Sequence, residues 1–511
     1  MGGVAEAEVL IIGAGPSGLF AAVELARHGV RARVVEREPQ PHHQARATAL
    51  QPGTLEILQQ AAVLDQIIPA CEQLAFARVF RLTDTGLACL SELSFGGLGC
   101  QWGYQCCLPQ WRTEQILADR FAESGGKVDR GISVISLAEQ DDSVQVDLEA
   151  ADGTRQSLDA AWVLGAGGAH STTRESMAEQ LTGSTYPGTA LVADVRVTAD
   201  LPRDGSALVA TPAGYVLLAP LPGDRWLTFI GDLDDDEIAL LDDSAPDAVA
   251  AALGRRIPPT VVRIDDVAWQ SAFLMHRRLA PRLAGNRRFL LGDAGHLSSP
   301  FGGEGLNSGL HDAHNLAWKL ALELRGRARP GLLDSFSWEQ QAADRHVLEV
   351  SDRLHQLAYA AVDSARSGAP APEPPAAEDV AAFARARSML DVSYAGTPLI
   401  GEQFAPGTQP LLSPAPGDRY PERARLTGTR HQLVIFGDPP AADVTRLRAR
   451  WQGIVDVGPG TGDPQRVGLL TDGAVVIRPD GYIGFRAAPA DHAACAAIDS
   501  HLSSYLVPGA A

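Results

Sequence analysis

The chain is short of positive charge. It has only two lysines, Lys127 and Lys319, and its formal net charge is −19. Proteins that bind nucleic acid or an anionic membrane surface meet the phosphates with clustered basic side chains, and this sequence contains no such cluster. Nucleic acid and membranes are therefore not expected as partners.

Long apolar runs and paired cysteines are missing as well. No apolar stretch is long enough to cross a bilayer, and the early run Val9–Ile12 is expected to be a first strand rather than part of a signal peptide. The six cysteines form no CxxC pair and no metal-ligand spacing, and adjacent Cys106 and Cys107 are expected in a buried strand. These absences predict a cytoplasmic enzyme without a metal site.

Glycine, in contrast, stands where a dinucleotide-binding turn needs it. The run Val9–Ile12 leads into Gly13-Ala14-Gly15-Pro16-Ser17-Gly18, and a helical pattern follows over Leu19–His28. In a strand, turn and helix of this kind, the first glycine allows the tight turn, the second lets the backbone approach a pyrophosphate, and the third permits close helix packing. The helix N-terminus then presents free N–H groups to the phosphates.

An acidic residue follows at the end of the next predicted strand. That strand, Arg33–Val35, delivers Glu36, whose carboxylate would accept hydrogen bonds from both ribose hydroxyls of an adenosine. An acid at this place disfavours a 2′-phosphate. Because strand, helix and acid accompany the glycines, an ordinary glycine-rich turn is the weaker interpretation.

A second glycine-rich region lies much later in the chain. Arg288–Leu291 has the pattern of a buried strand and ends in Gly292-Asp293, where an acid would hydrogen-bond the ribityl hydroxyls of a flavin. Pro300–Leu310 then leads into a long helix expected to begin near Gly305. The N-terminus of that helix would stabilise the negative charge that develops on a reduced flavin. A glycine-rich surface loop would not explain Asp293.

Together with several other segments, these motifs resemble the single-component class A flavoprotein monooxygenases of the p-hydroxybenzoate and phenol hydroxylase type. The branch of actinobacterial aromatic polyketide pathways is the most similar. The resemblance covers most of the chain. Besides the first glycine motif, the matching segments are Glu36-Arg37, Arg46-Ala47, the helix Gly53–Leu58, Leu108–Glu114, Arg278–Ala280, Gly292–His296 and Pro300–Asn307.

The resemblance implies FAD as cofactor and identifies residues that would contact it. Arg46 and Gln110 would contact the pyrophosphate and ribityl portions, and Arg112 would lie nearby. The residues expected to bind FAD are Gly13, Gly15, Ser17, Gly18, Glu36, Arg37, Arg46, Gln110, Arg112, Asp293, Pro300, Gly305, Leu306 and Asn307.

Four of these residues would hold the flavin end of the cofactor. Asp293 would hold the ribityl chain, and Pro300 would line the substrate side of the ring. Leu306 and Asn307 would offer backbone N–H groups to the pyrimidine.

One position departs from the family pattern. Members of the family usually carry an Asp-Gly pair in the middle motif, whose Asp helps to hold FAD and to receive the nicotinamide cofactor. In Leu164–Ser171 that position is Gly167, which has no side chain to accept a hydrogen bond or to orient an arginine. Two interpretations stay open: drift with compensation by neighbours, or loss of the step in which NADPH or NADH reduces the flavin.

The expected fold is α/β, with a Rossmann-like FAD-binding domain, an inserted antiparallel-sheet substrate domain and a C-terminal thioredoxin-like domain. From about Tyr186 to Ala272 the hydrophobic period changes to two, which predicts an antiparallel sheet that roofs the substrate pocket. The Pro-rich stretch Ala369–Ala376 is expected to be an extended link. The predicted units are 1–185 (first part of the FAD-binding domain), 186–275 (substrate-binding sheet), 276–368 (second FAD-binding part and long helices), 369–397 (linker and helix) and 398–511 (thioredoxin-like domain).

The thioredoxin-like unit is predicted from strands at Gln432–Phe436 and Ala474–Ile477 and from one further segment. That segment, Arg478–Arg486, resembles the closing hairpin of the C-terminal domain in the phenol hydroxylase branch. The unit has no CxxC pair and therefore does not exchange thiols. It is expected to be structural or to form an oligomerisation surface, as in a homodimer.

Other polar groups were weighed as sites. The acidic run Asp232–Glu237 with Asp242-Asp243 fits a solvated loop or a helix cap better than a metal site. The histidines near the flavin motifs do not form a set of three metal ligands, and His296 fits packing and hydrogen bonding at the flavin loop. The catalytic residue stays unassigned, with Tyr215 on the predicted sheet as a candidate.

Three functions are compatible with these features. The first is an FAD-dependent monooxygenase that hydroxylates an aromatic or polyketide-type small molecule through a flavin C4a-hydroperoxide, with NADPH or NADH as reductant. The second, motivated by Gly167, is a redox-neutral [4+2] cyclase of polyketide biosynthesis, similar to spirotetronate-pathway proteins, in which FAD only shapes the pocket. The third is a non-catalytic FAD-binding partner or scaffold.

Overall fold

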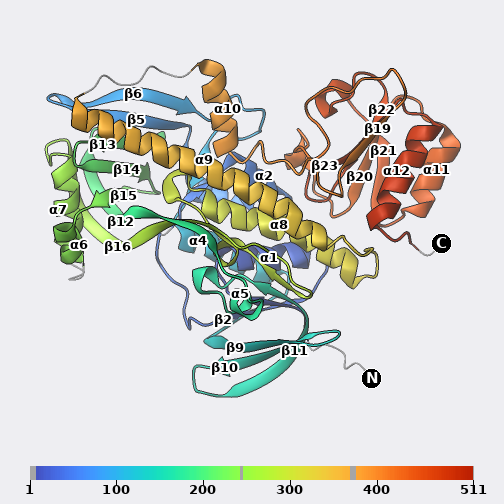
Figure 1. Cartoon of the computed structure of the whole chain (residues 1–511), viewed down its shortest axis with the longest axis horizontal. Helices are drawn as coiled ribbons and strands as arrows, with labels where there is room; N and C mark the ends of the chain where they lie inside the picture. The colour runs from blue at the N-terminus through green and yellow to red at the C-terminus, as the bar shows by residue number, and fades with distance from the viewer. Residues whose placement is uncertain (1–6, 46, 242–245, 369–375, 510–511) are drawn as a thin grey trace.

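The computed structural model describes residues 7–45, 47–241, 246–368 and 376–509. Arg46, the pair Asp242-Asp243 and residues 369–375 of the Pro-rich stretch lie outside these ranges. Figure 1 shows two layers of sheet joined by long helices, with the C-terminal domain packed to one side. Within the described ranges, no helix is both long and apolar enough to cross a membrane.

The first sheet is built around a parallel core near the N-terminus. Strand β1 (Ala7–Ile12) pairs in parallel with β2 (Ala32–Glu36) and with β11 (Arg155–Gly165). Val9 to Ile11 are fully buried, as expected for a central parallel strand covered on both faces. The other strands of this sheet are β8 (Val128–Arg130), β9 (Ile132–Glu139), β10 (Val144–Ala150) and β17 (Arg288–Leu290).

The chain leaves this sheet after β11 and returns to it at β17, which pairs in parallel with β11. The return brings the two glycine-rich regions to the same edge of the sheet. Helix α1 (Pro16–Arg27) follows β1 directly and packs against α8 (Glu304–Leu324), the helix that follows the second region.

The second sheet is largely antiparallel, as the period of two predicts. Its strands are, in spatial order, β18 (His296–Leu297), β16 (Val262–Leu279), β12 (Thr182–Ala199), β15 (Arg225–Leu233), β14 (Gly214–Pro220), β13 (Gly205–Thr211), β5 (Phe76–Thr83) and β6 (Gly86–Ser94). Strands β5 and β6 come from the first part of the chain, and β5 pairs in parallel with β13. The predicted unit boundaries themselves stay a prediction.

The long helix α9 (Asp334–Ser367) runs across the molecule from the C-terminal domain to the second sheet (Figure 1). Shorter helices cover the remaining surfaces: α2 (Pro52–Gln60), α3 (Leu64–Ile67), α4 (Gln110–Glu123), α5 (Thr172–Ser176), α6 (Asp235–Leu241), α7 (Pro246–Arg256) and α10 (Ala377–Arg387). The acidic run caps α6, because Asp234 Oδ1 accepts the Glu237 N–H at 2.8 Å.

A small third sheet joins β3 (Ala49–Leu50), β7 (Gln105–Cys107) and β4 (Glu72–Leu74). Cys106 and Cys107 are buried in β7, as predicted, and all six cysteines are free. The sheet contributes Ala49, Leu74, Gln105 and Cys107 to the cavity described below.

The C-terminal domain has its own sheet, in the order β19 (Gly401–Phe404), β23 (Ile483–Ala488), β22 (Gly473–Ile477), β20 (His431–Phe436) and β21 (Val455–Pro459). Helices α11 (Ala441–Arg450) and α12 (His492–Tyr505) cover it. Buried charges bind the domain to the rest: Arg478 pairs with Glu339 of α9 at 2.6 Å, and Glu339 also pairs with Lys319 of α8 at 2.7 Å. The domain is therefore anchored to both long helices.

Candidate active site

A cavity of about 870 Å³ lies between the first two sheets. One end is formed by the glycine turn Gly13–Ser17, the middle by Asp293 and the loop Pro300–Leu306, and the other end by the second sheet at Phe229 and Phe273. The two glycine-rich regions of the sequence thus open into one continuous space.

The glycine turn fits a pyrophosphate. Gly13 has φ +106°, and a Cβ there would lie 2.3 Å from the Ala166 carbonyl oxygen, so a side chain has neither the conformation nor the room. A Cβ at Gly15 would meet no atom within 4 Å, because this residue faces the cavity. No described side chain caps the N-terminus of α1, so its N–H groups are available to phosphate oxygens.

Glu36 ends β2 at the edge of the cavity. Its Oε2 accepts the Ala14 N–H at 2.7 Å and its Oε1 accepts the Glu38 N–H at 3.0 Å. These bonds fix the carboxylate, which keeps further lone pairs for ribose hydroxyls. Arg37 lines the cavity beside it.

The remaining predicted contacts of this end are distributed differently. Ser17 and Gln110 line the cavity, whereas Gly18 packs against the turn, where a Cβ would lie 2.1 Å from the Gly13 carbonyl oxygen. Arg112 is not among the lining residues and donates to Gln115 at 2.7 Å. The prediction for Arg46 falls outside the described residues.

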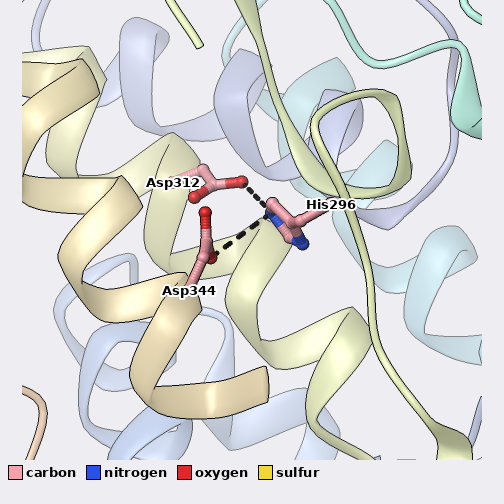
Figure 2. Close-up of side chains that lie close together, drawn as sticks. All are labelled: His296, Asp312 and Asp344. Atoms are coloured by element: carbon pink, nitrogen blue, oxygen red, sulfur yellow. Dashed lines mark hydrogen bonds and ion pairs between the residues drawn. The ribbon is translucent and has the colours of Figure 1, made fainter. Parts of the chain in front are cut away.

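The loop that carries Asp293 is held from behind by a buried charge cluster, the His296 cluster (His296, Asp312 and Asp344; Figure 2). Asp312 Oδ2 accepts the Gly292 N–H at 2.8 Å and lies 2.8 Å from His296 Nε2. Asp344 of α9 approaches the same ring nitrogen at 3.6 Å. The cluster therefore joins the Asp293 loop to α8 and α9.

Without a bound ion, the three side chains of this cluster interact as buried charged groups. The three ligand atoms lie within 4.8 Å of one another. Burial alone would lower the pKa of His296, but the carboxylates of Asp344 and Asp312 outweigh it and raise the pKa to about 10. Burial raises the pKa of Asp344 to about 8. A ring protonated at neutral pH donates from Nε2 to the Asp312 carboxylate at 2.8 Å.

The loop before α8 supplies part of the wall in the middle of the cavity. Pro300, Gly305 and Leu306 line the cavity, and Gly303, at φ +70°, precedes α8 without a side-chain cap among the described residues. Asn307 is fully buried behind them. Its Oδ1 accepts the Gln51 N–H at 2.8 Å, and its Nδ2 donates to the Ala49 carbonyl at 2.8 Å. Its side chain thus fastens the start of α8 to the third sheet.

The opposite end of the cavity is an apolar lobe. It is formed by Leu217, Leu227, Phe229 and Phe273 of the second sheet together with Phe301. Phe229 lies edge to face with Phe273 at 5.7 Å and with Phe301 at 5.8 Å. The sequence showed the strands but not which of their side chains would face the lobe.

Tyr215, the candidate catalytic group, lies behind this wall and is not a lining residue. Its ring packs 4.8 Å from Phe301 and 6.0 Å from Phe229, and its hydroxyl points to the Met275 sulfur at 4.0 Å. Burial raises the pKa of the Tyr215 hydroxyl well above its usual value. Tyr215 therefore supports the wall of the cavity from outside its lining, and its catalytic role stays a prediction.

Two residues that the sequence reasoning did not single out also belong to the site. Arg387, the last residue of α10, lines the cavity, and Glu304, the first residue of α8, is buried beside the loop. Glu304 lies within a motif that was recognised. Arg387 lies in a helix without any motif, so no sequence signal pointed to it.

Gly167 lines the cavity next to the glycine turn. It has φ −78° and ψ 13°, which any residue can adopt, and a Cβ would meet only Ile12 O and Ser171 Cα, both at 3.9 Å. The backbone at this position therefore does not require glycine, and it would accept the aspartate of the family pattern.

Comparison with known proteins identifies the family. Residues 6–351 match the family described as FAD binding domain. The chain belongs to this family. It is 32% identical over 518 residues to the 6-methylpretetramide 4-monooxygenase of Streptomyces rimosus, covering 93% of this chain and 90% of that protein. FAD is accordingly the cofactor that membership of this family implies.

Two solved structures share the whole fold. Aklavinone-11 hydroxylase in a ternary complex with FAD and aklavinone is 25% identical, with a TM-score of 0.77 over 98% of this chain and 99% of that chain. The Diels-Alderase of pyrroindomycin biosynthesis is 24% identical, with a TM-score of 0.73 over 98% and 99% of the two chains. The second likeness concerns the fold alone.

Proposed function

We propose that the protein is an FAD-dependent monooxygenase that hydroxylates an aromatic, polyketide-type substrate. One observation carries the proposal: the cavity is continuous from the glycine turn to the apolar lobe, so that a flavin ring and a flat apolar substrate would share one space. The names of the relatives, a 6-methylpretetramide monooxygenase and an aklavinone hydroxylase, support the same substrate class.

The residues of this chain divide the task between them. FAD held here supplies electron transfer and activation of O2. The N-terminus of α8 directs the positive end of a helix dipole at the cavity near Gly305 and Leu306, where it stabilises negative charge. The apolar lobe at Phe229 and Phe273 would exclude water, which protects reactive intermediates from side reactions.

The proposed reaction requires a reductant. NADPH or NADH would have to dock without the carboxylate that the family places at Gly167. The experiment is to mix the FAD-loaded protein with each nucleotide anaerobically, with and without a polycyclic phenol, and to follow bleaching of the flavin visible band. Bleaching with either nucleotide supports the proposal, and its absence under all conditions contradicts it.

The second candidate is a redox-neutral [4+2] cyclase. Gly167 favours it, because a flavin that is never reduced needs no docking residue for a nicotinamide. The apolar lobe would then hold a polyene folded for ring closure. Such an enzyme would give an isomeric product without change of mass and without reductant, whereas strict dependence on NAD(P)H and O2 would exclude it.

A further inference from the structure

Arg387 brings a buried positive charge to the cavity from an unexpected direction. It is the last residue of α10, and the backbone carbonyl of the next residue, Ser388, accepts the Gly53 N–H at 2.8 Å. This contact holds the end of α10 against the N-terminus of α2. Arg387 is 8% exposed and lines the cavity.

The guanidinium has no ionic partner among the described residues. No hydrogen bond or ion pair links it to another described group, and its Nε is buried without an acceptor. The Phe95 ring lies 5.6 Å from its Cζ. The buried carboxyl of Glu304 attracts it from farther away, yet both Glu304 oxygens also lack a hydrogen-bond partner.

A buried cation without a partner is costly, because it has lost hydration without gaining an ion pair. The same arrangement is favourable once an anion enters. A guanidinium binds carboxylates and other anionic oxygens with two parallel N–H donors, and a largely dry wall strengthens that bond.

The position of Arg387 separates it from the cofactor's phosphates. Arg37 and Arg130 line the cavity at the Glu36 end, where Arg130 pairs in register with Glu36. Arg387 instead lies close enough to Cys107 of β7 to affect the pKa of its thiol, and both residues line the cavity. Cys107 packs in one cluster with Ala219 and Leu221, next to Leu227 of the apolar lobe. The charge of Arg387 therefore lies at the substrate side of the cavity.

We propose that Arg387 binds an anionic oxygen of the substrate, a carboxylate or an ionised phenol or enol, and so selects acidic polycyclic molecules. This rests on the proposed function and names its substrate class more closely. A reduced flavin would also present an anionic oxygen, so it is the alternative ligand for Arg387 that the test must distinguish from the substrate.

The test uses binding to the oxidised, FAD-loaded protein, which needs no turnover. Anthraquinone-2-carboxylate and its methyl ester are titrated separately while the flavin visible spectrum is followed. The parent protein is expected to bind the acid about 10-fold more tightly than the ester, as a charge-assisted bond implies. In Arg387→Gln the preference should disappear, and in Arg387→Lys part of it should remain.

The matched control is Arg385→Gln, on the same helix. Arg385 donates to the Leu98 carbonyl and does not line the cavity, so its loss tests the packing of α10 without removing the cavity charge. The acid preference should persist in that variant. Thermal unfolding and FAD content show whether each variant is folded.

Two outcomes would overturn the proposal. Equal binding of acid and ester by the parent does so even if Arg387→Gln fails to fold. A preserved preference in a folded Arg387→Gln variant, together with a lowered flavin midpoint potential, assigns the residue to the flavin instead. Failure of anaerobic reduction would contradict the monooxygenase function but leave these binding results intact.

Discussion

The two ends of the cavity are built from different parts of the polypeptide. The end proposed to hold the cofactor depends largely on backbone: Gly13 and Gly15 shape the turn, and the start of α1 has no side-chain cap. The apolar lobe consists of side chains, such as Phe229 and Phe273, that project from neighbouring regions of one sheet. The difference explains why the cofactor could be inferred from sequence while the substrate could not.

Backbone requirements leave a strict record in the sequence. A turn with positive φ and a carbonyl in contact admits only glycine, so the spacing of glycines identifies the site. A lobe lined by side chains accepts many apolar residues of similar volume. We therefore expect substitutions at the cofactor end to be severe and those in the lobe to be graded.

The largest effect is expected for Gly13→Ala. The substitution forces a Cβ to within 2.3 Å of the Ala166 carbonyl at φ +106°, which should cost at least about 3 kcal/mol of folding free energy and release FAD. Thermal unfolding and the ratio of flavin to protein absorbance measure both effects.

Gly15→Ala is the matched control at the same end. Its Cβ would meet no atom within 4 Å, so the unfolding temperature of the FAD-free protein should stay the same while FAD affinity falls. Equal unfolding temperatures for both variants would contradict the distinction between a glycine needed for the fold and one needed for the ligand.

The next effect concerns pH and the His296 cluster. The raised pKa of His296, about 10 against 6.5, contributes stability that is present below pH 6.5 and is lost as the pH rises toward 10. The raised pKa of Asp344, about 8 against 3.8, likewise makes stability fall as the pH rises toward 8. Unfolding temperature and FAD retention should therefore both decline between pH 6.5 and 10.

Asp344→Asn provides the comparison for this decline. It removes the titration of Asp344, so the unfolding temperature should fall less steeply between pH 6.5 and 8 than in the parent. An unfolding temperature that is constant across this range in the parent would mean that the cluster is not charged as inferred.

Glu36→Ala should weaken FAD binding by about 1.5–3 kcal/mol, the value of charge-assisted hydrogen bonds. Loss of the bond to the Ala14 N–H at 2.7 Å adds a local loosening of the turn. The variant should purify partly colourless, and fluorescence of released FAD gives the dissociation constant. Glu36→Gln keeps one acceptor, so its FAD affinity should lie between those of the parent and Glu36→Ala. Full FAD retention in Glu36→Ala would show that this carboxylate is not a ribose ligand.

In the apolar lobe, Phe229→Leu should leave FAD affinity unchanged. It removes the edge-to-face contacts with Phe273 and Phe301 and should weaken binding of a polycyclic probe such as anthraquinone-2-carboxylate by about 0.5–1.5 kcal/mol. Titration followed by the visible spectrum of the bound flavin gives the affinity for the probe, and the ratio of flavin to protein shows how much FAD is bound. Loss of FAD with unchanged probe binding would reverse the assignment of the two ends.

The same division describes how far the sequence could be interpreted. The parallel strands β1, β2 and β17, the glycine turn and the start of α8 were predicted from hydrophobic runs and glycines. The period of two also revealed the second sheet, but not that β5 and β6 join it, because pairing between distant strands has no local signal.

Local sequence patterns do not predict the position of a side chain that depends on contacts between segments far apart in the sequence. Tyr215 was chosen for its residue type, and the structure places its ring behind Phe301, because strand alternation fixes the face but not the depth. Arg387 reaches the cavity only because α10 docks against α2, a contact between segments more than three hundred residues apart. Positions of this kind depend on tertiary packing.

The smallest effect is expected at Gly167, the one place where the cofactor end departs from its family pattern. If the missing carboxylate limits docking of the nicotinamide, Gly167→Asp should speed anaerobic reduction of the flavin by NADPH or NADH, by about 2- to 5-fold for one solvent-accessible charge. Stopped-flow bleaching of the flavin band measures this rate, and Gly167→Asn serves as the uncharged control.

The structure makes this test clean. Gly167 has φ −78°, and a Cβ there would meet its nearest atoms at 3.9 Å, so the aspartate introduces neither backbone strain nor a clash. If the FAD content and unfolding temperature of the variant match those of the parent, misfolding is excluded as the cause of an unchanged reduction rate. A folded, FAD-replete Gly167→Asp protein reduced no faster than the parent would show that this position does not control the reductive step. The cofactor end would then tolerate the loss of this one side chain, because the glycine turn, Glu36 and the helix termini would hold FAD without it.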